Sequence, residues 1–280
     1  MREFNIDYIV EAHGLTRSIS KTDTDLKPYV ESFISALRAK CVQVPPLDYS
    51  VEWGALSSTV LASTSTSFHQ VSDVWMPSNS FKIVFNPHFQ WWNGTCSSKP
   101  VSHYDLKSTV MHEVLHGLGY MSTISQDKTA WPSNFDLLLR DSAGELVVSG
   151  GKYLGNIGDK VSIEHVRMYN PSTYESGSSF SHEYNGAHLM SHSQTTCHRE
   201  LEHDTLFILN HLGYQCSLNG TRLAGKSVEN QGTFLYIGGV VGVIVIVVIV
   251  CIYKSTTGRK RRDFTKEPLL DSVKMNTNRR

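Results

Sequence analysis

Two histidines one helical turn apart carry the clearest chemistry in this sequence. In the stretch TVMHEVLHGLGY, His112 and His116 are four residues apart, so on a helix both imidazoles would project from one face and could bind a single ion. Glu113, beside the first ligand, can take a proton from a metal-bound water instead of binding the metal. The pattern predicts one catalytic zinc ion (Zn²⁺), but such an ion normally takes three protein ligands. A third ligand must come from elsewhere in the chain.

A helix over residues 106–118 would hold this motif. Asp105 can cap its N-terminus by accepting hydrogen bonds from the first free backbone N–H groups. Gly119 can adopt the left-handed backbone conformation and turn the chain sharply where the helix ends. The motif is therefore predicted to lie on an amphipathic helix between a defined cap and a structural turn.

Other periodic segments surround this helix. Residues 4–12 and 81–89 alternate apolar and polar side chains, which predicts strands with one buried face. Residues 23–40 and 203–214 have apolar side chains at helical spacing. Residues 135–151 suggest a hairpin or two short strands around a turn at 142–144. This order of elements predicts the α+β class.

The residues alone leave the third metal ligand open, because histidines are frequent after the motif. The candidates between residues 165 and 203 are His165, His182, His188, His192, His198 and His203.

A resemblance to a known family narrows the choice. HExxHxxG resembles the start of the metzincin zinc proteases, but most of that clan has a third ligand where this chain has Ser122. In the leishmanolysin-like branch an insertion precedes the third histidine, which ends a Ser-His segment and is followed by a methionine turn. GSSFSH, ending at His182, and HLMS, containing Met190, are similar to those two segments. The resemblance covers roughly residues 60–216 and implies that His182 is the third ligand.

The same resemblance implies a fold and an activity. The fold would be a metzincin-like two-subdomain protease: residues 1–119 with a twisted mixed sheet and the zinc helix, and an irregular subdomain over 120–216. The activity would be zinc-dependent hydrolysis of peptide bonds in protein or peptide substrates, with Glu113 as general base. Tyr184 or His192 could assist the oxyanion. Strand 81–89 would be an edge strand that pairs with an extended substrate.

Two other functions are compatible with the same residues. A surface binding or adhesion protein could have kept this fold without catalysis, although an intact Glu113 argues against it. A cytosolic, tail-anchored metalloprotein is the third hypothesis. The equal numbers of basic and acidic residues, 26 of each, give no reason to expect a nucleic-acid partner.

The C-terminal part has the composition of a membrane anchor. Residues 234–253 carry no charge and are long enough to cross a bilayer as a single transmembrane helix. Residues 217–233 would form a stalk, and the basic segment 254–280 a cytoplasmic tail, which places the N-terminal domain outside the cell or in a lumen. Gly238 and Gly242 could support helix dimerisation. The first ten residues do not resemble a signal peptide, so an upstream segment or tail insertion is expected.

Cysteines and glycosylation sequons agree with an exterior location. The sequons begin at Asn93 and Asn219. Pairing Cys197 with Cys216 would close a short loop and leave Cys41 for Cys96. Four free buried thiols are the alternative.

Overall fold

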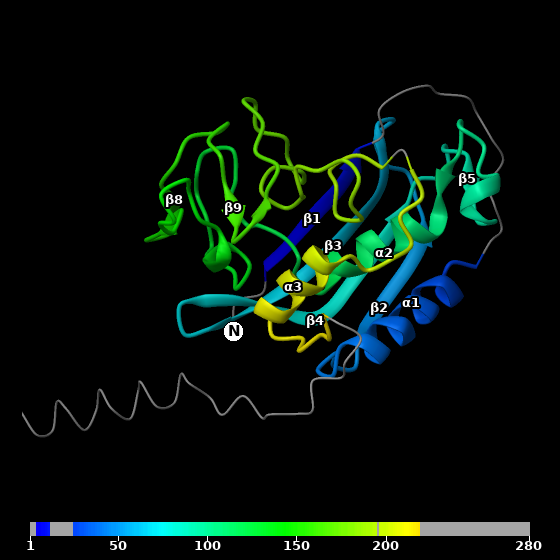
Figure 1. The fold of residues 1–280 in the computed structure, drawn as a ribbon, viewed down its shortest axis with the longest axis horizontal. Coiled ribbons are helices and arrows are strands. Elements are labelled where there is room, and N and C mark those ends of the chain that lie inside the picture. The colour runs from blue at the N-terminus through cyan, green and yellow to red at the C-terminus, as the bar shows by residue number, and fades with distance from the viewer. Residues whose placement is uncertain (1–3, 12–24, 195, 219–280) are drawn as a thin grey trace, which may run out of the picture. The chain divides into compact units, whose positions relative to one another are not determined.

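The computed structural model describes residues 4–11, 25–194 and 196–218 of the 280-residue chain. These residues all fall within one compact unit, Met1–Ala224. They form a mixed α+β structure with one larger sheet, three helices and several two-residue strand pairs, as Figure 1 shows. The predicted α+β class is confirmed. The division into subdomains at residue 119 stays a prediction.

A mixed four-stranded sheet forms the largest regular element. Its strands are β1 (Phe4–Glu11), β2 (Asp48–Trp53), β3 (Val60–Val71) and β4 (Val74–Phe85), in the order β1-β3-β4-β2. β3 is antiparallel to both β1 and β4, whereas β2 runs parallel to β4.

The strand predicted over 81–89 is therefore not an edge strand. It begins earlier, at Val74, and hydrogen-bonds to β3 on one side and β2 on the other. The predicted alternation is correct, because Phe81, Ile83 and Phe85 are all buried. The alternating pattern predicts which side chains are buried, but it does not reveal that β2 pairs in parallel with β4 and covers its second edge.

Two helices cover one face of this sheet (Figure 1). α1 (Lys27–Lys40) buries Val30, Phe33, Ile34 and Leu37, the positions that its spacing predicts. α2 (Leu106–Gly117) packs against α1 and against strands β3 and β4, and all of its residues except Lys107 are buried. The prediction of an amphipathic α2 is wrong, since a helix enclosed on all sides has no solvent face.

Residues after α2 form a largely irregular layer held by short pairs of strands. β7 (Val148–Ser149) pairs with β8 (Lys152–Tyr153), and β9 (Ser162–Ile163) pairs with β10 (Val166–Arg167). The predicted turn at 142–144 forms, but only an isolated bridge flanks it, and the regular hairpin follows it in the chain. The remaining short elements are β5 (Trp91–Trp92), β6 (Tyr104–Asp105), and the 3₁₀ turns η1 (Cys96–Ser98) and η2 (Asp136–Leu138).

A last helix, α3 (His203–His211), follows these loops. It buries Ile208 and Leu209 against the core, and Gly213 ends it in the left-handed conformation at φ 103°. The predicted helix over 203–214 is confirmed, three residues shorter at its C-terminal end.

The four cysteines form two disulfides, but not in the predicted pairs. Cys41 bonds to Cys216, and Cys96 bonds to Cys197. The predicted pairing of Cys197 with Cys216 is wrong because Cys216 instead lies opposite Cys41 in an isolated antiparallel bridge. The chain after α3 returns to the end of α1, where Ser217 N donates to Lys40 O at 2.9 Å.

Several predictions concern residues outside the described part of the chain. They are most of the stalk over 217–233, the span over 234–253 with Gly238 and Gly242, the tail over 254–280, and the sequon at Asn219. Among the described residues, no helix combines the length and apolar character needed to cross a membrane. Asn93, in the other sequon, is exposed, and its side chain donates to the Tyr29 hydroxyl at 3.0 Å.

Candidate metal centre

Three histidine side chains converge at the C-terminal half of α2. The Nε2 atom of His112 lies 2.9 Å from that of His116 and 3.0 Å from that of His182. The third Nε2–Nε2 distance, between His116 and His182, is 3.2 Å. All three residues are fully buried. This three-histidine centre (His112, His116 and His182) unites the two motif histidines with the one that the resemblance implied.

Backbone carbonyls fix how each ring is protonated. The Nδ1 atoms of His112, His116 and His182 lie 2.7, 2.7 and 3.0 Å from the carbonyl oxygens of Leu189, Tyr120 and Ser178. A carbonyl can only accept, so each Nδ1 carries the hydrogen of a neutral imidazole, and each Nε2 presents a lone pair to the other two.

Burial keeps these rings neutral. It lowers the pKa of His112 to about 4. It also holds the pKa of His116 and of His182 well below the usual range, with a further contribution from neighbouring imidazoles. Neutral nitrogen donors are what a metal ion requires.

The geometry of the three nitrogens fits a cation. Three lone pairs about 3 Å apart repel one another unless a positive charge lies between them. Tetrahedral coordination with metal–nitrogen bonds of ~2.0–2.1 Å places its ligand atoms ~3.3 Å apart, close to the spacing here. The centre could therefore hold a metal ion.

A buried carboxylate lies next to the first ligand. Oε2 of Glu113 accepts a hydrogen bond of 2.5 Å from the Thr64 hydroxyl on β3. Its other oxygen, Oε1, is buried without a hydrogen-bond partner among the described residues. Burial raises the pKa of Glu113 to about 8, although the bond from Thr64 opposes the rise. Glu113 thus has one anchored oxygen and one available to a ligand.

A turn over His188–Ser191 presents the carbonyl that holds His112. Ser191 N donates to His188 O at 3.2 Å, and Met190 is completely buried within this turn. Glu202 fixes the turn from the start of α3, because its Oε1 accepts from Leu189 N at 3.1 Å. The turn with a buried methionine is present as predicted, and the position of Met190 beneath an ion stays a prediction.

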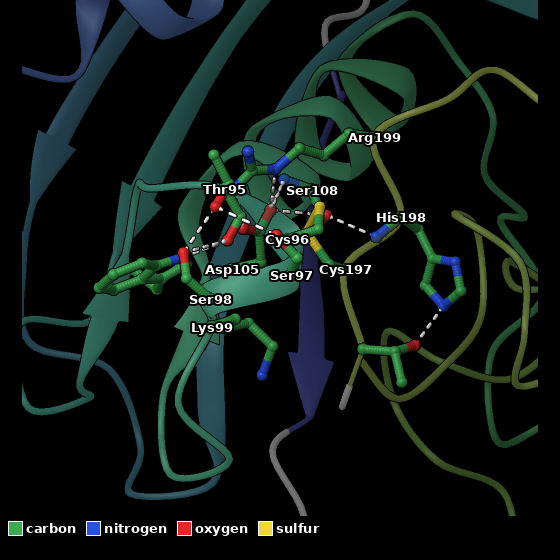
Figure 2. Close-up of a disulfide and its surroundings, with 12 residues drawn as sticks. Thr95, Cys96, Ser97, Ser98, Lys99, Asp105, Ser108, Cys197, His198 and Arg199 are labelled. Carbon is green, nitrogen blue, oxygen red and sulfur yellow. Dashed lines mark hydrogen bonds and ion pairs between the residues drawn. A yellow bond between two sulfur atoms is a disulfide. The ribbon is translucent and has the colours of Figure 1, made fainter.

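The N-terminus of α2 is fixed by a partly buried ion pair beside a disulfide, shown in Figure 2. Asp105 caps the helix as predicted and accepts from Ser108 N at 2.7 Å. Its carboxylate also receives two bonds from Arg199, whose segment is tied to η1 through Cys96–Cys197. Burial by itself raises the pKa of Asp105, but the bonds from Arg199 and Ser108 outweigh it, so the pKa is lowered.

The chain turns sharply at the other end of α2. Gly119 has φ 91°, and a Cβ there would lie 2.8 Å from the Pro77 ring. This turn brings Tyr120 O back to His116. Further along, Ser122 donates to the buried carboxylate of Asp136 at 2.6 Å. Ser122, where most metzincins have a ligand, is thus engaged in holding the loop.

The rival histidines lie elsewhere. His165 and His203 both lie against Asp204 on the surface, and His188 lies 2.5 Å from Glu183. The two suggested oxyanion groups also differ from each other: Tyr184 is exposed beneath the Arg167 guanidinium, whereas His192 stacks on Tyr169. His198 bonds to Thr196.

Sequence reasoning missed the partners that orient the site. Thr64 and Asp136 gave no signal, because an isolated threonine or aspartate is common in any chain. The three carbonyls that set the histidine tautomers belong to the backbone and have no side-chain pattern.

Comparisons with protein-family profiles, with curated proteins and with solved structures found no match to this chain.

Proposed function

We propose that this chain is a zinc-dependent endopeptidase of the leishmanolysin-like metzincin type, acting on protein or peptide substrates. The observation that carries the proposal is the convergence of three neutral imidazoles next to a buried glutamate with one unpaired oxygen. Structural zinc sites usually close with four protein ligands, whereas a site with three leaves a position for chemistry. A glutamate has no role in a purely structural site of this kind.

His112, His116 and His182 would hold the ion through Nε2, with their Nδ1 atoms anchored on carbonyls. When bound, zinc supplies Lewis acidity, which lowers the pKa of water toward ~7 and polarises a carbonyl. Burial alone disfavours the ionised form of Glu113, but a bound cation beside it would favour that form. The ionised Glu113 then accepts the proton of the attacking water at its unpaired oxygen and later donates it to the leaving amine. Thr64 holds the other oxygen, so the carboxylate keeps one orientation throughout.

The test is peptide cleavage by the full-length chain purified in detergent. Glu113→Gln preserves size and removes the base, so we expect a loss of roughly 10²–10⁴-fold in kcat. Glu145→Gln, a change at an exposed glutamate, is the matched control and should leave the rate unchanged. A chelator should also abolish cleavage.

The opposite result would be a folded, zinc-loaded wild type that cleaves nothing. It would overturn the peptidase and leave a catalytically silent surface protein that binds its partner without hydrolysis. Zinc content settles the ligand set separately: His182→Ala should lose the ion, and full occupancy in that variant would show that a different residue completes the site.

We also propose that the domain faces the exterior or a lumen and is anchored by residues 234–253. Two disulfides among the described residues support an oxidising compartment. Glycosidase treatment of the chain from its native membrane should increase its gel mobility, and Asn93→Gln should remove part of that shift. A chain without any glycan, with reduced cysteines, would instead fit the cytosolic tail-anchored protein.

A further inference from the structure

A second group of metal-ligating side chains lies on the surface, outside the three-histidine centre. His165, His203 and Asp204 each offer one ligand atom, and these three atoms lie within 4.8 Å of one another. Oδ1 of Asp204 is 3.0 Å from His165 Nε2 and 3.4 Å from His203 Nδ1. One carboxylate oxygen thus already faces both imidazoles.

His165 and His203 come from segments that are distant in sequence, and the fold brings them together. His165 lies in the two-residue turn between β9 and β10, where Glu164 adopts a left-handed φ of 51°. That hairpin is tied to the layer beneath it by reciprocal backbone bonds between Arg140 and Ser162, at 2.8 and 2.9 Å. The His165 ring also packs on Phe207 of α3, with centroids 5.0 Å apart.

The other two ligands belong to the first turn of α3. His203 and Asp204 are consecutive, so their side chains would not face each other on a regular helix surface. They meet His165 because the hairpin lies beside the N-terminal turn of α3. The partial positive charge of a helix N-terminus opposes a cation, but Asp204 supplies a full negative charge at that point.

The donor set selects the kind of ion. Two imidazole nitrogens and one carboxylate oxygen suit zinc and its neighbours in the first transition series, whereas calcium and magnesium prefer oxygen ligands alone. The ligands are partly exposed, so water can complete the coordination.

We propose that His165, His203 and Asp204 form a second zinc site, which joins the β9–β10 hairpin to α3. This ion would brace the central site indirectly. Glu202, just before these ligands, holds Leu189 N, and the carbonyl of Leu189 orients His112. The second ion therefore has a structural role at the helix that fixes the methionine turn.

The experiment is a calorimetric titration of the metal-free, full-length chain with Zn²⁺, read as ions bound per chain. We expect His165→Ala to bind one ion fewer than the wild type. His211→Ala, which removes an exposed histidine from the same helix, should bind as many as the wild type. His165 is exposed, so its removal should leave the fold intact.

A second measurement is the unfolding temperature (Tm) of each protein as zinc is added. Zinc added beyond the amount that fills the tighter site should raise the Tm of the wild type further, and should not do so for His165→Ala. The difference in ions bound between wild type and His165→Ala does not depend on the three-histidine centre. If that centre binds no ion, both proteins bind one ion fewer and the difference between them stays the same.

An equal number of ions in wild type and His165→Ala would overturn the second site. If His188→Ala then lost an ion, that ion would belong to the neighbouring group of Glu183, His188 and Asp204.

Discussion

Replacing Gly119 by alanine should destabilise the protein by more than its backbone conformation alone explains. Gly119 has φ 91°, a conformation that disfavours an L-residue by roughly 1–2 kcal/mol. The new Cβ would also lie 2.8 Å from the Pro77 ring of β4, and overpacking of this kind costs about 1–3 kcal/mol. The two contributions together predict a loss of about 2–5 kcal/mol in the free energy of unfolding.

Gly144 is the matched control. Its φ is 85°, but a Cβ there would meet nothing within 4 Å, so Gly144→Ala carries only the backbone contribution. For a unit of this size ~1 kcal/mol shifts Tm by ~2–4 °C. Thermal unfolding followed by circular dichroism should therefore show a drop several degrees larger for Gly119→Ala than for Gly144→Ala.

The same substitution should weaken metal binding. The turn at Gly119 positions Tyr120 O, which holds the Nδ1 atom of His116. Loss of such a supporting bond typically reduces metal affinity by ~10–100-fold. Equal Tm losses in the two variants, together with unchanged zinc affinity in Gly119→Ala, would refute the argument that this glycine is required by its contact with β4.

The remaining predictions concern the groups that support the site. Thr64→Val should slow peptide cleavage by ~10–100-fold, because Glu113 loses its anchor, while Thr66→Val, which removes a buried hydroxyl with no partner among the described residues, should change the rate little. Arg199→Ala should lower the free energy of unfolding by about 3–5 kcal/mol, measured with denaturant, because Asp105 stays buried without its counterion. Burial raises the pKa of Asp105, but the bonds from Arg199 and Ser108 together outweigh it, so the folded pKa is lowered. In the wild type this contribution to stability is therefore fully present above pH ~4 and is lost as pH falls through the lower folded pKa. Arg199→Ala removes part of the lowering and should flatten that acid limb. A chelator should lower the wild-type Tm, and zinc should restore it.

The sequence predicts those parts of the fold that depend on local chemistry. The cap at Asp105, the helix after it and the turn at Gly119 are each set by a few adjacent residues, and all three are present. Strand order and disulfide pairing depend on how distant segments pack. The β2–β4 pairing and the Cys41–Cys216 bond therefore could not be deduced from spacing.

The third ligand lies between these two cases. His182 is 66 residues from His116, and no periodicity connects them. Six histidines were open from the residues alone, and only the likeness of the segments around His182 and Met190 to a known family selected one. The structure brings that histidine to the motif and leaves the other five outside the centre.

The arrangement around the three-histidine centre also links metal binding to folding. Its histidines are oriented by carbonyls from three loops, at Tyr120, Ser178 and Leu189, so the centre is complete only when all three loops are in place. Without an ion, three buried lone pairs would face one another, and buried polar groups without partners are costly. A cation removes that cost in the folded state alone, since the unfolded chain does not gather these residues. The free energy of binding a metal ion would therefore be part of the stability of this domain, and the loops after α2, which have little regular structure, are where its loss should first appear.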